Sequence, residues 1–118
     1  MVTDWEKLTK EMTAAVQDLR TGQPDVMAAF SAMAKAALAK GALDTKTKEL
    51  IALAIGVAAR CDACIGFHAK AALRQGASRE EVMETLAMAV YMGAGPSVMY
   101  AAQALESFDQ FTAAKAPA

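Results

Sequence analysis

The sequence lacks an excess of charge of either sign. Its 12 Lys and Arg residues are balanced by 13 Asp and Glu residues, which leaves a formal net charge of -1. The chain contains no block of basic residues and no acidic tail. Because nucleic-acid-binding proteins normally concentrate basic residues on one surface, the sequence argues against a nucleic-acid partner.

The chain also lacks a hydrophobic run suited to a leader or a membrane anchor. Charged residues from Asp4 onward interrupt the N-terminal segment, where a signal peptide needs a continuous apolar stretch. The longest uncharged stretch, which includes residues 85–103, would be long enough to span a bilayer. It contains the Gly93 to Pro96 segment near its middle, and a helix rarely continues through such a sequence. We therefore expect no membrane span and a cytoplasmic protein.

Aromatic residues are scarce, and no segment shows the alternation of polar and apolar residues that is typical of a β-strand. Aromatics account for 6% of the chain, whereas hydrophobic residues make up 55%. The excess consists of Ala, Leu, Met and Val, which occur readily in helices and their cores. We predict an all-α fold in a single domain over residues 1–118. A protomer this small cannot cover so much apolar surface alone, so we expect a helical bundle that assembles into a homo-oligomer.

About six helices are predicted from start and stop signals in the sequence. Pro24 suits the first turn of the second helix, Asp44 is a capping residue for the third, and Ser78 with Glu81 forms a capping box for the fifth. The Gly93 to Pro96 turn separates the last two helices. By approximate range, the expected helices are 4–19, 24–40, 45–57, 62–74, 79–91 and 98–108.

The only two cysteines, Cys61 and Cys64, lie in one tetrapeptide. In a reducing cytoplasm such a pair is typical of catalytic, redox-sensing or metal-binding sites rather than of a permanent cross-link. Residues three and four apart are neighbours on a helix, so Cys61, Cys64 and His68 form one stripe. If Cys61 begins the helix, both sulfurs lie near its positive end, which favours the reactive thiolate.

These residues supply a coherent set of chemical groups. His68, the only histidine, can act as a base or proton carrier for Cys64. Cys61 can then condense with an oxidised Cys64 and release water. Glu49 could orient His68 only if the chain reversed direction near residues 58–61, because one unbroken helix would hold them about 30 Å apart. Nothing in the local sequence requires that reversal.

Other interpretations of the motif remain open at this point. Zinc could be bound by Cys61, Cys64, His68 and Glu49, since these residue types are its usual ligands. Covalent haem attachment needs a histidine directly after the second cysteine, where this chain has Ile65.

The spacing of Glu49, Cys61, Cys64 and His68 resembles the active-site signature of the alkylhydroperoxidase D-like proteins, which belong to the carboxymuconolactone decarboxylase superfamily. The resemblance extends from about Leu43 to Phe108. It implies an all-α fold that assembles as a homotrimer or homohexamer. It also implies that Cys64 is the peroxidatic cysteine and Cys61 the resolving one, with His68 and Glu49 as a proton relay.

The resemblance further implies a thiol-dependent peroxidase that reduces a hydroperoxide without a cofactor or a metal. Its electrons would come from a dithiol donor, either a lipoyl-bearing or a thioredoxin-like protein. The chain departs from the best-known peroxidase of the family at Ala63, where that enzyme has a histidine between its cysteines. The alternatives are a general disulfide reductase, a lyase of the carboxymuconolactone decarboxylase type, and a redox-sensing or zinc-binding oligomer. Decarboxylases of the superfamily generally lack the cysteine pair, which argues against the lyase.

Overall fold

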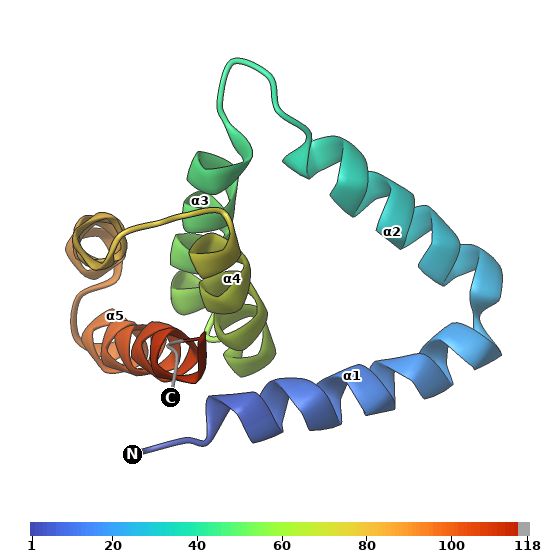
Figure 1. Cartoon of the computed structure of the whole chain (residues 1–118), viewed down its shortest axis with the longest axis horizontal. Coiled ribbons are helices and arrows are strands. Elements are labelled where there is room, and N and C mark those ends of the chain that lie inside the picture. The colour runs from blue at the N-terminus through green and yellow to red at the C-terminus, as the bar shows by residue number, and fades with distance from the viewer. Residues whose placement is uncertain (116–118) are drawn as a thin grey trace.

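The computed structural model describes residues 1–115 and is built from helices alone over that range. The predicted all-α fold is therefore confirmed. The elements in chain order are α1 (Trp5–Gly22), α2 (Pro24–Leu38), α3 (Thr45–Ala58), α4 (Asp62–Arg74) and α5 (Arg79–Lys115) (Figure 1). No helix among the described residues is long and apolar enough to cross a membrane.

The helix count differs from the six predicted, because the last two expected helices form a single bent element. The backbone of Ala94 leaves the helical region, with φ 51° and ψ -136°, and the helix continues with Pro96 in its next turn. Figure 1 shows the two arms of α5 running in different directions on either side of this bend. The break therefore lies within the predicted Gly93 to Pro96 segment, where two helical arms meet at the non-helical residue Ala94.

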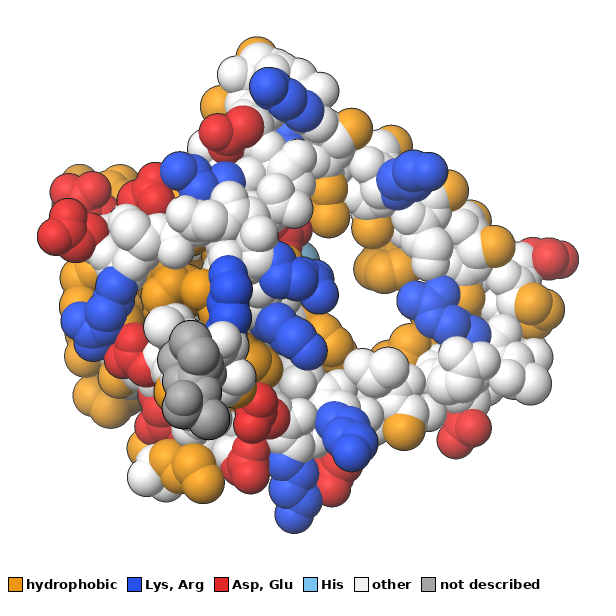
Figure 2. Space-filling model, in the orientation of Figure 1, with side chains coloured by type: hydrophobic (Ala, Val, Ile, Leu, Met, Phe, Trp, Pro, Cys, Tyr) orange, Lys and Arg blue, Asp and Glu red, His pale blue; other side chains and the backbone are white. Residues whose placement is uncertain are grey.

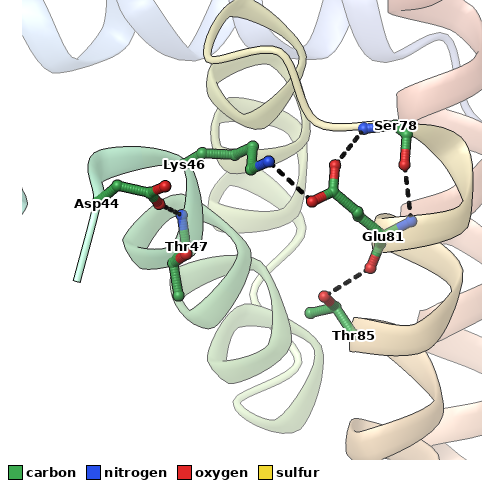
Figure 3. Close-up of polar contacts among 6 residues, drawn as sticks. All are labelled: Asp44, Lys46, Thr47, Ser78, Glu81 and Thr85. Carbon is green, nitrogen blue, oxygen red and sulfur yellow. Dashed lines mark hydrogen bonds and ion pairs between the residues drawn. The ribbon is translucent and has the colours of Figure 1, made fainter.

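Helices α3 and α5 begin at the capping residues predicted for them, and α1 has a side-chain cap of the same kind at Asp4. Asp4 and Asp44 accept hydrogen bonds from the backbone N–H groups of Lys7 and Thr47. At the start of α5, the backbone N–H of Glu81 donates to Ser78 Oγ, and the backbone N–H of Ser78 donates to Glu81 Oε1 (Figure 3). This reciprocal pair is the predicted capping box.

The α5 capping box is also connected to α3. Glu81 accepts an ion pair from Lys46 at 2.8 Å, which links the first turns of the two helices (Figure 3). The Lys46 ammonium group and the cap hydrogen bonds hold the pKa of Glu81 below its usual value. Because Glu81 is at the surface, the ion pair adds little to the free energy of unfolding. Its role is to hold the first turns of α3 and α5 next to each other.

The core is formed where α3, α4 and α5 pack together and the first turn of α1 closes one end. Trp5 of α1 is completely buried, and it lies against α4 at Gly66. A Cβ atom on Gly66 would lie 2.7 Å from Thr9 Cγ2 and 3.3 Å from Trp5 Cε3. Close contact between α1 and α4 therefore depends on the absence of a side chain at position 66.

We expect Gly66→Ala to lower the free energy of unfolding by about 1–3 kcal/mol, the usual cost of overpacking a core. Thr9 is buried and donates a hydrogen bond to the Trp5 carbonyl, so it cannot move aside freely. Gly41→Ala is the matched control, because a Cβ at that loop position meets nothing within 4 Å. Urea unfolding of both variants measures the difference, and equal midpoints would show that the contact is not tight.

The second helix is poorly covered by the rest of the chain. None of its 15 residues is buried, and Phe30 and Met33 on its apolar side are 53% and 61% exposed. The space-filling view shows an open passage through the molecule, bordered by α1, α2 and the α3–α4 pair (Figure 2). The apolar face of the second helix, which includes Phe30 and Met33, therefore remains uncovered within this protomer.

Candidate active site

The cysteines lie at a sharp reversal between α3 and α4. After α3 ends at Ala58, Arg60 adopts a left-handed conformation with φ 57°, and the Cys61 N–H donates to the carbonyl of Gly56. The chain then enters α4, which packs beside α3. This is the reversal near residues 58–61 that a Glu49–His68 contact requires.

Cys61 and Cys64 are joined in a disulfide across the first turn of α4, with their Cα atoms 5.2 Å apart. Cys61 is the N-cap residue of α4, and its Sγ accepts a hydrogen bond from the Cys64 N–H at 3.2 Å. Both sulfurs are therefore at the positive end of the helix, as predicted. The partial positive charge of that end stabilises a thiolate when the disulfide is reduced. Both residues are half-buried, so the pair lies near the surface.

The position of Cys64 against α3 depends on a glycine that sequence reasoning missed. A Cβ atom on Gly56 would lie 3.2 Å from Cys64 Cβ, so Gly56 lets the first turn of α4 pack closely on α3. Its carbonyl also accepts the Cys61 N–H at 3.0 Å. The available signal was spacing: Gly56 follows Glu49 by two helical turns and so lies on the same face.

Further along the same helix pair, His68 meets Glu49. His68 Nδ1 lies 3.3 Å from Glu49 Oε2. The Glu49 side chain is 4% exposed, whereas that of His68 is 32% exposed. The carboxylate is thus held inside the protein and the imidazole lies between it and the surface. The structure therefore brings together two residues that are 19 positions apart in the sequence.

This contact determines how the imidazole can be used. If Nδ1 carries a proton, it donates to the Glu49 carboxylate and leaves Nε2 free to accept a proton from another group. His68 also follows Cys64 by one helical turn, so the two side chains leave α4 on the same side. The other carboxylate oxygen, Glu49 Oε1, is buried and accepts no hydrogen bond from the described residues. A buried carboxylate with spare acceptor capacity can stabilise a protonated imidazole.

The alternative zinc site is not formed in this structure. Within residues 1–115, no group of three or more His, Cys, Asp or Glu side chains is arranged to hold a metal ion. Both sulfurs are occupied by the disulfide bond, and the carboxylate is directed at His68. The four residues therefore form two pairs, a disulfide between the cysteines and a contact between an imidazole and a carboxylate.

Comparison with known proteins identifies the family to which the chain belongs. The profile of the carboxymuconolactone decarboxylase family matches residues 24–107, which include both pairs. The chain belongs to this family. A carboxymuconolactone decarboxylase family protein from Legionella pneumophila, crystallised in its apo form, has 52% sequence identity and a TM-score of 0.90. That match covers 92% of this chain and 96% of the Legionella chain.

Other proteins are also similar to this chain over most of its length. A family protein from Thermotoga maritima, for which a role in the antioxidative response has been suggested, has 27% identity and a TM-score of 0.76, covering 87% of this chain and 91% of that one. An uncharacterized protein from Haemophilus influenzae is 47% identical over 92% of this chain and 96% of its own length. Another from Cupriavidus necator is 42% identical over 96% of this chain and its full length.

Proposed function

We propose that this family member is a thiol-dependent peroxidase of the alkylhydroperoxidase D type. The observation that carries the proposal is the pairing of a Cys61–Cys64 disulfide at the start of α4 with a His68–Glu49 contact one turn further along the same helix pair. A nucleophile, a resolving thiol and a supported base are the three parts that peroxide reduction by cysteine needs.

The reaction begins with the reduced pair. His68 Nε2 accepts the proton of the Cys64 thiol, directly or through a water, while Glu49 stabilises the imidazolium through Nδ1. The Cys64 sulfur then attacks one oxygen of the hydroperoxide; a sulfur–oxygen bond forms and the oxygen–oxygen bond breaks. The leaving alkoxide takes a proton from His68 and departs as the alcohol. Cys64 is left as a sulfenic acid.

The second step returns the site to the state seen here. The Cys61 sulfur attacks the Cys64 sulfur, a disulfide bond forms, and the sulfenic oxygen leaves as water. An external dithiol then reduces the disulfide by exchange and is itself oxidised. In total, a hydroperoxide and a dithiol give an alcohol, water and a disulfide. The donor is a lipoyl-bearing or thioredoxin-like protein in this proposal, and the support for its access is that Cys61 and Cys64 are only half-buried.

Thiol counting tests the proposal. We expect the fully reduced protein, mixed with one equivalent of cumene hydroperoxide, to lose both thiols and release one equivalent of the alcohol per chain. Survival of both thiols would contradict peroxidase activity. Loss of thiols with a small disulfide but not with the peroxide would instead identify a disulfide reductase, because the same sulfur pair can perform that exchange.

We also propose that the protein assembles as a homotrimer or homohexamer. The support is the uncovered apolar side of α2, together with the open passage that α1 and α2 border (Figure 2). A lone protomer gains little by holding α2 in place, whereas a second copy would cover its apolar side chains.

We expect the double variant Phe30→Glu with Met33→Glu to dissociate into monomers, since it places charges on that apolar face. Light scattering after size-exclusion chromatography measures the mass directly. Gln75→Glu, at the exposed end of α4, is the control and should leave the assembly intact. A wild-type protein that is monomeric, or a double variant of unchanged mass, would contradict the assignment of this interface.

A further inference from the structure

A second candidate site lies in a groove of about 590 Å³ between α1, the C-terminal half of α4 and the end of α5. None of the four redox residues contributes to it. Its lining combines basic, apolar and hydroxyl side chains and consists of Glu6, Thr9, Lys10, Thr13, Phe67, Lys70, Leu73, Arg74, Phe111, Ala114 and Lys115. A concave space of this volume is in the range of sites for small organic ligands.

The charge of the groove differs from that of the protein as a whole. The chain has a net charge of -1. The groove, in contrast, is lined by four basic residues and one acidic residue, Glu6; the basic residues are Lys10, Lys70, Arg74 and Lys115. Within the described part of the chain, none of these four basic side chains forms an ion pair. Figure 2 shows Lys and Arg side chains gathered over α4. This concentration of unpaired positive charge would attract an anion.

The apolar part of the groove includes two aromatic rings beside the aliphatic side chains of Leu73 and Ala114. Phe67 and Phe111 contribute their rings, and Lys70 Nζ lies 5.6 Å from the centre of the Phe111 ring. The hydroxyl groups of Thr9 and Thr13 already donate to backbone carbonyls of α1. The polar groups of the groove that remain available to a ligand are therefore mainly the basic side chains. They lie beside the rings of Phe67 and Phe111.

We propose that this groove binds a small organic acid, a carboxylate carried on a flat apolar body such as an aromatic ring system. The carboxylate would pair with Lys70 and Arg74, which follow one another by one turn of α4. The apolar body would lie against Phe67 and Phe111. The site is separate from the cysteines, so the proposal does not depend on peroxidase activity.

Calorimetric titration of the full chain with 2-naphthoate tests the proposal, with 2-naphthamide as the neutral ligand of the same shape. We expect one saturable site per chain and binding of the acid at least about tenfold tighter than that of the amide. Added salt should weaken the binding of 2-naphthoate and leave the binding of 2-naphthamide unchanged. Equal binding of acid and amide, or no saturable binding of the acid, would overturn the proposal.

Variants locate the site. We expect Lys70→Gln with Arg74→Gln to weaken naphthoate about tenfold, while Lys35→Gln with Lys40→Gln, which removes the same charge elsewhere, leaves it unchanged. Thr13→Trp keeps all four basic residues but fills the groove from an exposed position, and it should abolish binding. Cys61→Ser with Cys64→Ser should bind as the wild type does. Equal losses in both charge variants, or unchanged binding by Thr13→Trp, would place the ligand elsewhere.

Discussion

Cys64→Ser is expected to abolish steady-state peroxide reduction, whereas Cys61→Ser should allow one oxidation per chain and then stop. The asymmetry follows from the two roles proposed for the sulfurs. Without the Cys64 sulfur, the site lacks the thiol that precedes His68 by one helical turn and that attacks the peroxide in this proposal. Without Cys61, Cys64 still attacks, but its sulfenic acid has no neighbouring thiol with which to form the disulfide seen here.

Peroxide consumption measures both effects in two assays. With dithiothreitol as donor, the wild type should turn over repeatedly and Cys64→Ser should match the rate without protein. With pre-reduced protein freed of added thiol, which would itself reduce a sulfenic acid, Cys61→Ser should consume about one equivalent in a burst. Adding dimedone to the Cys61→Ser protein should trap the sulfenic acid and prevent any slow recovery. Equal activity of the two variants, or a burst from Cys64→Ser, would show that the assigned roles are wrong.

His68→Asn is expected to lower the rate of the peroxide step by about 10²- to 10⁴-fold near neutral pH, the usual contribution of a positioned base. Part of the loss should be recovered as the pH rises, since hydroxide can then deprotonate Cys64 without an imidazole. Glu49→Gln should lose less, because its amide oxygen can still accept the Nδ1–H of His68 although the negative charge is gone.

Stopped-flow measurement of thiol loss against pH distinguishes these effects. Glu84→Gln, at an exposed position of α5, is the control for a change of charge and should behave as the wild type. A mainly structural role for His68 would reduce the rate by the same factor at every pH. Thermal unfolding of each variant shows whether the loss of activity reflects the site or the fold.

Local signals in the sequence were sufficient to predict most of the helices. Asp44 and the Ser78–Glu81 box start their helices as expected, because a side-chain cap is a contact between residues three positions apart. The bend of α5 falls in the Gly93 to Pro96 segment, but its form as a single non-helical residue could not be predicted from residue types alone.

The contacts between the site residues could not be predicted from local sequence signals. Contact between Glu49 and His68 depends on the reversal at Arg60, which has positive φ although arginine has no special preference for that conformation. Only the family resemblance indicated that the two residues should meet. The role of Gly56 was missed for a similar reason. Gly56 has no side chain, and this allows Cys64 of α4 to pack closely against α3.

The reactivity of Cys64 toward iodoacetamide, measured in the Cys61→Ser background, shows most directly whether His68 maintains a thiolate at that position. Only one thiol is then present, and only its ionised form reacts. Near neutral pH, we expect alkylation at least about tenfold faster than that of a cysteine in an unstructured peptide. Adding His68→Asn should remove most of this difference. A rate equal to that of the peptide, unchanged by the loss of His68, would contradict the proposed mechanism.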